Sequence, residues 1–200
     1  MALVWGMTKN KCSFVEGSLV GRCLIAVPSA TDDRFEKSVV YICSADDNDG
    51  VMGIVFNKPL YGIGFKDIFE QMNFPAKETE KYPPVFWGGP VEASRGFLLH
   101  SSDYKASQTL QISKDICLTS TIDALMDIAE GKGPEEKLFA LGYANWSAGQ
   151  LEMEMAANSW LVVPATPDLI FRTNPPDKWE KAVRMIGIDP LMLSLEQGSV

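Results

Sequence analysis

Residues 38–56, SVVYICSADDNDGVMGIVF, predict a β-hairpin. Residues 38–43 and 51–56 are two apolar runs rich in β-branched and aromatic residues, which favour strands. The cluster between them, Asp46 to Gly50, is typical of a turn, because Asp and Asn accept local main-chain hydrogen bonds and Gly tolerates a positive φ. We therefore expect antiparallel pairing at the centre of the fold.

Apolar runs on both sides of this hairpin extend it into a larger sheet. Further strands are expected over 24–27, 85–87, 96–100, 109–112, 138–143 and 160–163. Helices are expected over 65–72, 120–130, 147–157 and 176–185, with one short helical turn at Pro167. Several strands come before the first substantial helix and hairpins are frequent, so an α+β fold is favoured over strict alternation of strands and helices.

The expected architecture is a single α+β domain. Its core would be a mixed, largely antiparallel sheet, or a partly closed barrel-like core, flanked by helices. A chain of 200 residues fits one domain. Residues 1–17 are expected to form a flexible N-terminal extension, 18–192 the folded domain and 193–200 a C-terminal tail.

The charge balance limits the partners of the protein. The chain carries 26 Asp and Glu against 18 Lys and Arg, a net charge of −8. Proteins that bind nucleic acid usually present a basic face, so direct binding of nucleic acid is not expected. The apolar stretch at residues 2–5 has no basic region before it, unlike a secretory signal. No apolar run approaches the ~20 residues of a membrane-spanning helix, so we expect a cytoplasmic protein without membrane contact.

The four cysteines, Cys12, Cys23, Cys43 and Cys117, have none of the two-residue spacings of zinc or thioredoxin-like motifs. Cys23 and Cys43 each lie in an apolar, strand-like run, where a reduced cysteine behaves as a small hydrophobic residue. The alternative is a redox pair between neighbouring strands, which requires Cα atoms within about 7 Å.

A serine-hydrolase motif is incomplete in this chain. Residues 145–149, Asn-Trp-Ser-Ala-Gly, lie between a predicted strand and a predicted helix, as a nucleophile elbow does. The first glycine of the G-x-S-x-G pattern is missing, and the only histidine, His100, precedes the serine. Ser147 and Gln150 instead have the spacing of a helix capping box.

The acidic turn is also a poor calcium loop. Placing Gly50 at position 6 of an EF-hand puts Ala45 at position 1 and Phe56 at position 12, so the entry ligand and the bidentate glutamate are both absent. The turn is better explained as a solvated hairpin connection.

The predicted helix over 147–157 does not present two carboxylates together. Glu152 and Glu154 are two residues apart, or about 200° around a helix, and so diverge. Gln150 and Glu154 share one face of the helix at a spacing of four. This pattern favours a single buried glutamate, hydrogen-bonded to main-chain amides, over an acid–base pair.

Polar residues recur at the predicted ends of strands and loops, where they contribute little to packing. Asp33, Arg34, Asn57, His100 and Gln150 would mark a ligand pocket if they converged, and would be caps and surface pairs if they were scattered. Residues 88–91, Gly-Gly-Pro-Val, form either a tight turn or an anion cradle of bare main-chain amides. The complete set of predicted ligand-binding residues is Asp33, Arg34, Asn57, Gly88, Gly89, His100, Trp146, Gln150 and Glu154. No catalytic residue, metal ligand or cofactor is predicted.

Several blocks of the sequence occur in an order that is familiar from one protein family. They are 21–28 with Asp33, Phe35 and 38–39; 53–59; 88–91 with 99–100; and 142–146 with 149–152, Glu154, Asn158 and Trp160. These blocks resemble those of the bacterial YqgE/AlgH family, and the resemblance covers roughly residues 20–190. Asn145 is a departure, since the family usually has glycine there.

The resemblance implies an α+β fold with a sheet-rich core. Members of the family are mostly uncharacterised, and no catalytic residue set is established for them. The AlgH name is associated with transcriptional control of alginate synthesis. Because this chain is acidic, any effect on transcription is expected to be indirect.

Three functions are compatible with these observations. The first is a non-enzymatic regulatory or interaction protein with an unidentified protein partner. The second is a protein that binds a small molecule or a nucleotide-derived ligand, with possible weak hydrolase activity. The third is a redox sensor that uses Cys23 and Cys43.

Overall fold

The computed structural model describes residues 18–28, 32–74 and 82–195. The strands are β1 (Arg22–Ala26), β2 (Val39–Asp46), β3 (Gly50–Val55), β4 (Val85–Trp87), β5 (Val91–Ser101), β6 (Leu110–Gln111), β7 (Ile116–Thr119), β8 (Lys137–Trp146) and β9 (Trp160–Pro164). The helices are α1 (Phe65–Gln71), α2 (Ile122–Ala129), α3 (Gln150–Ala156), α4 (Lys178–Met185) and α5 (Pro190–Leu195), with short turns η1 (Asp33–Phe35), η2 (Asp168–Arg172) and η3 (Pro175–Asp177).

The predicted hairpin is present. Strands β2 and β3 pair antiparallel from Val40 opposite Val55 to Asp46 opposite Gly50, with a bulge between Ile42 and Ser44. In the turn, Oδ1 of Asp46 accepts hydrogen bonds from the main-chain N–H groups of the second and third residues that follow it, at 2.8 and 3.2 Å. The acidic turn is therefore closed by local side-chain bonds, as its composition predicts.

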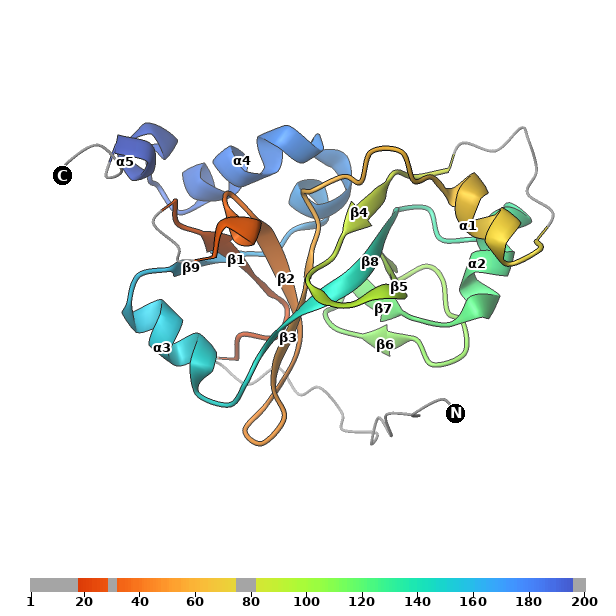
Figure 1. Cartoon of the computed structure of the whole chain (residues 1–200), viewed down its shortest axis with the longest axis horizontal. Helices are drawn as coiled ribbons and strands as arrows, with labels where there is room; N and C mark the ends of the chain where they lie inside the picture. The colour runs from red at the N-terminus through yellow and green to blue at the C-terminus, as the bar shows by residue number, and fades with distance from the viewer. Residues whose placement is uncertain (1–17, 29–31, 75–81, 196–200) are drawn as a thin grey trace.

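All the described strands belong to one curled sheet (Figure 1), in the order β6-β7-β5-β8-β3-β2-β1-β9, with β4 parallel to β8. Strand β8 joins the two halves, because its first part pairs with β5 and its last part with β3. The predicted α+β class and largely antiparallel, partly closed core are confirmed, since the sheet forms a half-barrel with helices around it.

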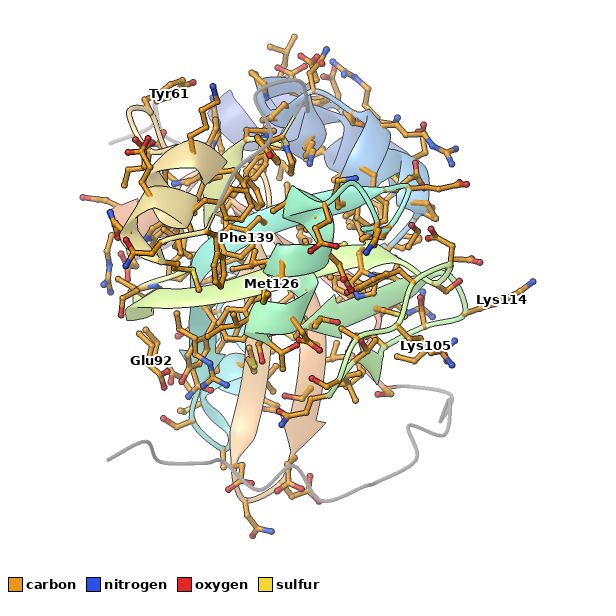
Figure 2. The ribbon with its side chains drawn as sticks, turned by 90° about the vertical axis from the view of Figure 1, so that its right-hand side faces the viewer. Tyr61, Glu92, Lys105, Lys114, Met126 and Phe139 are labelled. Atoms are coloured by element: carbon orange, nitrogen blue, oxygen red, sulfur yellow. The ribbon has the colours of Figure 1, made fainter. Side chains whose placement is uncertain are left out.

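The apolar side chains divide into three clusters. The largest fills the space between the sheet and α4, a second lies beneath α3 against β1, β2 and β3, and a third lies beneath α1 and α2 against β5 and β8. Figure 2 looks onto the α2 end, with α2 and Met126 in front of the strands. Alternate residues of a strand point to opposite faces, so the central strands contribute to more than one cluster.

Several element boundaries differ from those expected. Strand β7 and helix α5 are not predicted by the sequence patterns, and β5 is longer than the expected 96–100. Helix α2 begins after Thr121 and not at Ser120, and α3 begins after Gly149, whose φ is +76°, and not at Ser147. Helix α5 spans the boundary expected at residue 192, and the predicted extension at 1–17 lies outside the described residues. No helix within the described ranges is long and apolar enough to cross a membrane.

Lys178 is buried where α4 meets the sheet, with 2% of its surface exposed. Its Nζ donates to the main-chain oxygens of Phe56, at 3.0 Å, and Ile170, at 2.6 Å, and lies 4.9 Å from the centre of the Phe56 ring. None of the ion pairs found in the described part of the chain includes it. Burial lowers the pKa of Lys178 from its ordinary value of 10.5 to about 7.

Replacing Lys178 with Met is expected to remove a pH dependence of stability. Between pH 7 and 10.5 the unfolded lysine holds a proton that the folded lysine releases, so its contribution to the free energy of unfolding rises with pH. In urea unfolding, the wild type should gain about 1 kcal/mol per pH unit over Lys178→Met above pH 7. Lys181→Met, at a surface lysine paired with Asp168, is the control and should run parallel to the wild type. If the stability of Lys178→Met changed with pH in the same way as that of the wild type, the lowered pKa of Lys178 would be contradicted.

Candidate functional site

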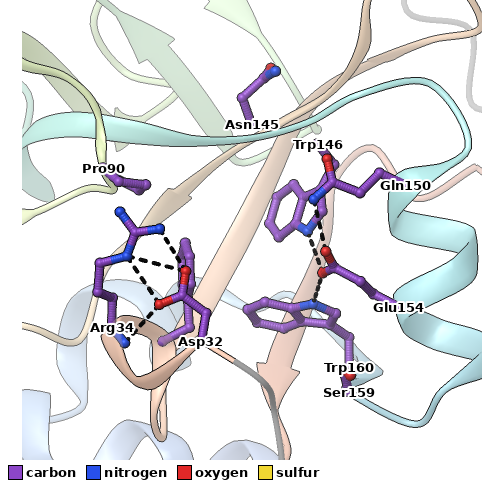
Figure 3. A pocket seen from close by; sticks show the side chains of 10 residues that line it. Asp32, Arg34, Pro90, Asn145, Trp146, Gln150, Glu154, Ser159 and Trp160 are labelled. Carbon is purple, nitrogen blue, oxygen red and sulfur yellow. Dashed lines mark hydrogen bonds and ion pairs between the residues drawn. The ribbon is translucent and has the colours of Figure 1, made fainter.

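A pocket that is partly open to solvent lies where η1, the end of β8, the start of α3 and the start of β9 meet (Figure 3). Its volume is about 130 Å³. We call it the Glu154 pocket, and its lining residues are Asp32, Arg34, Phe35, Pro90, Asn145, Trp146, Gln150, Glu154, Ser159 and Trp160. The pocket therefore combines three aromatic side chains with charged and amide groups from distant parts of the sequence.

The aromatic wall consists of Trp146, Trp160 and Phe35. The two indoles meet edge to face, with ring centres 5.4 Å apart, and Phe35 packs on Trp160 at 5.5 Å. All three are almost completely buried. Trp146 ends β8 and Trp160 begins β9, so the wall is built from two strands that are not neighbours in the sheet.

The carboxylate of Glu154 accepts three side-chain hydrogen bonds. Its Oε2 accepts from Nε1 of Trp146, at 2.9 Å, and from Nε1 of Trp160, at 2.7 Å, and its Oε1 accepts from Nε2 of Gln150, at 2.8 Å. The expected sharing of one helix face by Gln150 and Glu154 is confirmed. The expectation that a glutamate here bonds to main-chain amides is wrong, because both indole N–H groups point at this side chain and supply the donors.

The opposite wall is an ion pair on η1. Asp32 caps the turn by accepting from the main-chain N–H of Arg34, and it also binds the Arg34 guanidinium through Nε, at 3.0 and 3.1 Å, and Nη2, at 2.7 Å. These hydrogen bonds from Arg34 lower the pKa of Asp32 below its ordinary value. Lys58 supports the turn from behind, since its Nζ donates to the main-chain oxygen of Arg34 at 2.5 Å. Asp32 thus engages one edge of the Arg34 guanidinium, and Lys58 supports the main chain of the turn.

Four of the predicted ligand residues, Arg34, Trp146, Gln150 and Glu154, line this pocket. Asp33 lies in η1 beside the pocket, but of these two neighbouring aspartates it is Asp32, the N-cap of η1, that lines it. The sequence patterns did not single out Asp32, Asn145, Ser159 or Trp160 as ligand residues. A usable signal for Asp32 was its position two residues before Arg34, the spacing of an Asx turn.

Asn57 and His100 do not line the pocket. Asn57 accepts from the main-chain N–H of Val39 and donates to the main-chain oxygen of Lys37, so it fixes the start of β2. The His100 ring is buried, with Nδ1 2.8 Å from the oxygen of Ser101 and Nε2 2.9 Å from Oγ1 of Thr119. A carbonyl can only accept, so Nδ1 carries the proton and Nε2 accepts from the threonine hydroxyl. Burial lowers the pKa of His100, which favours this neutral form.

Gly88 and Gly89 pack against β8. The N–H of Gly88 donates to the oxygen of Leu141 at 2.8 Å, so it is engaged within the sheet. A Cβ at Gly88 would lie 2.2 Å from the oxygen of Gly142, and one at Gly89 would lie 2.1 Å from the carbonyl carbon of Tyr143. These contacts make glycine necessary for the close approach of two backbones and leave the tight turn as the better explanation of this segment.

The described cysteines are buried, free thiols. Burial raises the pKa of Cys23 and of Cys43 far above the ordinary value. The thiolate is the reactive form of cysteine, so this environment argues against a redox sensor. Among the described residues, no group of three or more His, Cys, Asp or Glu side chains could hold a metal ion.

Glu154→Ala is expected to destabilise the fold by about 3 kcal/mol, because it leaves two buried indole N–H groups without an acceptor. Glu152→Ala is the matched control on the same helix, where the side chain is exposed, and should change stability by less than about 0.5 kcal/mol. Chemical unfolding followed by tryptophan fluorescence measures both. Equal stabilities for the two variants would show that the indole bonds contribute nothing.

Gly88→Ala is expected to cost about 3 kcal/mol, since the added methyl group overlaps the oxygen of Gly142 and neither backbone can move freely. The control is Gly64→Ala, where a Cβ meets only an oxygen of Asp67, at an ordinary 3.5 Å. Thermal unfolding of the two variants should give a much lower midpoint for Gly88→Ala. A well-folded Gly88→Ala chain with wild-type stability would refute the proposed backbone contact.

The comparisons with known proteins agree with this fold. The AlgH-like family model matches residues 23–191. The UPF0301 protein of Methylobacterium nodulans is 47% identical over 188 residues, covering 90% of this chain and 89% of the relative. That of Jannaschia sp. is 44% identical over 182 residues, covering 90% and 94%.

Two solved structures are similar over most of the chain. The solution structure of the AlgH protein from Pseudomonas aeruginosa has a TM-score of 0.77 at 34% identity and covers 94% of this chain and 97% of that one. The crystal structure of a Corynebacterium diphtheriae protein shares the fold, with a TM-score of 0.66 at 18% identity over 88% and 89% of the two chains. The family match, the sequence identities and the shared fold together show that the chain belongs to the AlgH-like family.

Proposed function

We propose that this protein is a non-enzymatic, cytoplasmic regulatory protein that binds a small polar molecule in the Glu154 pocket. The observation that carries the proposal is the convergence of Arg34, on η1, with Gln150 and Glu154, on the distant helix α3, at one aromatic-walled pocket. Binding sites commonly combine apolar walls with a few precisely placed polar groups. The pocket volume of about 130 Å³ fits a small molecule.

The pocket supports binding better than catalysis. Glu154 is oriented by three donors and Arg34 is paired with Asp32, an arrangement that favours recognition of a ligand by groups already placed before it binds. Ser147 Oγ donates to Gln150, while His100 bonds to Thr119, so the serine has no histidine base beside it. A regulatory role would follow if the ligand changed the affinity of the protein for an unidentified protein partner.

A thermal-shift screen tests the proposal. The panel is amino acids, nucleobases, nucleotides, sugars and small carboxylates. A ligand present at 100 times its dissociation constant stabilises the fold by about 2.7 kcal/mol, which gives a clear rise in the midpoint. Arg34→Ala and Gln150→Ala should each abolish this rise.

Arg184→Ala is the control for these variants, because Arg184 is an exposed arginine paired with Glu180 away from the pocket. It should bind as the wild type does. A ligand that stabilises the wild type and all three variants equally would bind outside the pocket. If no member of the panel stabilises the wild type, the proposal is refuted.

A further inference from the structure

The polar groups of the Glu154 pocket offer two opposite charges to a ligand. On one side, Asp32 occupies only the Nε–Nη2 edge of the Arg34 guanidinium. The other edge, formed by Nη1 and the second N–H of Nη2, makes no hydrogen bond to any described residue, and the Arg34 side chain is 62% exposed. A free guanidinium edge of this kind binds a carboxylate through two parallel hydrogen bonds.

On the other side, Glu154 has acceptor capacity left. A carboxylate has about four lone-pair sites, and the described residues fill three of them: two on Oε2 by the indoles and one on Oε1 by Gln150. The remaining site on Oε1 can accept from an ammonium group.

The sum of charges on the lining residues is informative about the ligand. Arg34 is positive, while Asp32 and Glu154 are negative, so the wall as a whole carries one net negative charge. A phosphate or a dicarboxylate would meet that excess of negative charge, and an uncharged sugar would bring no charged partner to the free edge of Arg34 or to the remaining acceptor site of Glu154. A molecule with one positive and one negative group satisfies both ends of the pocket.

We propose that the ligand is a small α-amino acid in its zwitterionic form. Its carboxylate would bind the free edge of Arg34, its ammonium group would donate to Oε1 of Glu154, and a small apolar side chain would lie against Phe35 and the indoles. This inference rests on the proposed function, because it names the ligand of the same pocket. The pocket volume of about 130 Å³ fits the smaller amino acids.

Calorimetric titration of the full chain tests the two charges separately. Glycine, L-alanine, L-serine, L-valine and L-leucine are titrated first. The amide of the best ligand, which lacks the carboxylate, and its N-acetyl derivative, which lacks the ammonium group, are titrated next. Each change should weaken binding by about tenfold or more, since each removes a charge-assisted hydrogen bond.

The Arg34→Gln variant tests whether the carboxylate of the ligand binds Arg34. It should bind the amino acid and its amide with nearly equal affinity, whereas the control Arg184→Gln should keep the wild-type preference for the acid. The ammonium end is tested with the ligand analogue in the wild type, because substituting Glu154 also disturbs the indoles.

The outcomes separate this inference from the proposed function. If the amide or the N-acetyl derivative binds as tightly as the free amino acid, the proposal that the ligand is a zwitterion is wrong. If no amino acid binds, while another member of the wider panel binds and loses affinity in Arg34→Ala, the zwitterion is wrong and the pocket assignment stands. If nothing in either experiment binds, both proposals fail.

Discussion

The carboxylate of Glu154, bound by two indole N–H groups, is the interaction on which this part of the structure depends. The indoles belong to β8 and β9, which are separated in the sheet by β3, β2 and β1. In a flat sheet, four strand spacings would hold these strands about 19 Å apart. Their ring centres are nevertheless 5.4 Å apart, because the sheet curls around its apolar cluster, and α3 brings the carboxylate to the place where β8 and β9 approach each other. The pocket is thus a consequence of the curl of the sheet.

The parts of the fold that are encoded locally could be predicted from the sequence. The hairpin over 38–56 combines two β-branched runs with a turn whose Asp46 closes it through its own side chain, so the information is contained in 19 neighbouring residues. Strand β7 is short and lies close before a helix, and only its pairing with β5 and β6 makes it a strand. The parallel contact of β4 with β8 likewise depends on residues far apart in the sequence, and no local pattern indicates it.

The same distinction holds for the candidate site. The spacing of four between Gln150 and Glu154 predicts their contact because a helix places them on one face. The indole donors of Glu154 could not be predicted in this way, since Trp160 reaches it only through the meeting of β8 and β9. Asn57 and His100 resemble ligand residues in sequence, yet each uses its polar atoms on backbone or buried side-chain partners within the fold.

The pairing of β9 with β1 has a consequence for synthesis of the chain. Arg22 to Ala26 lie opposite Pro164 to Trp160, so one edge of an early strand obtains its partner only when residues near 160 have been made. Until then the nascent sheet presents unpaired main-chain groups, which other chains can bind. Contacts between such distant segments also form slowly. A ribosome that stalls before this point would release a chain with an open sheet edge, the kind of species that chaperones and proteases remove.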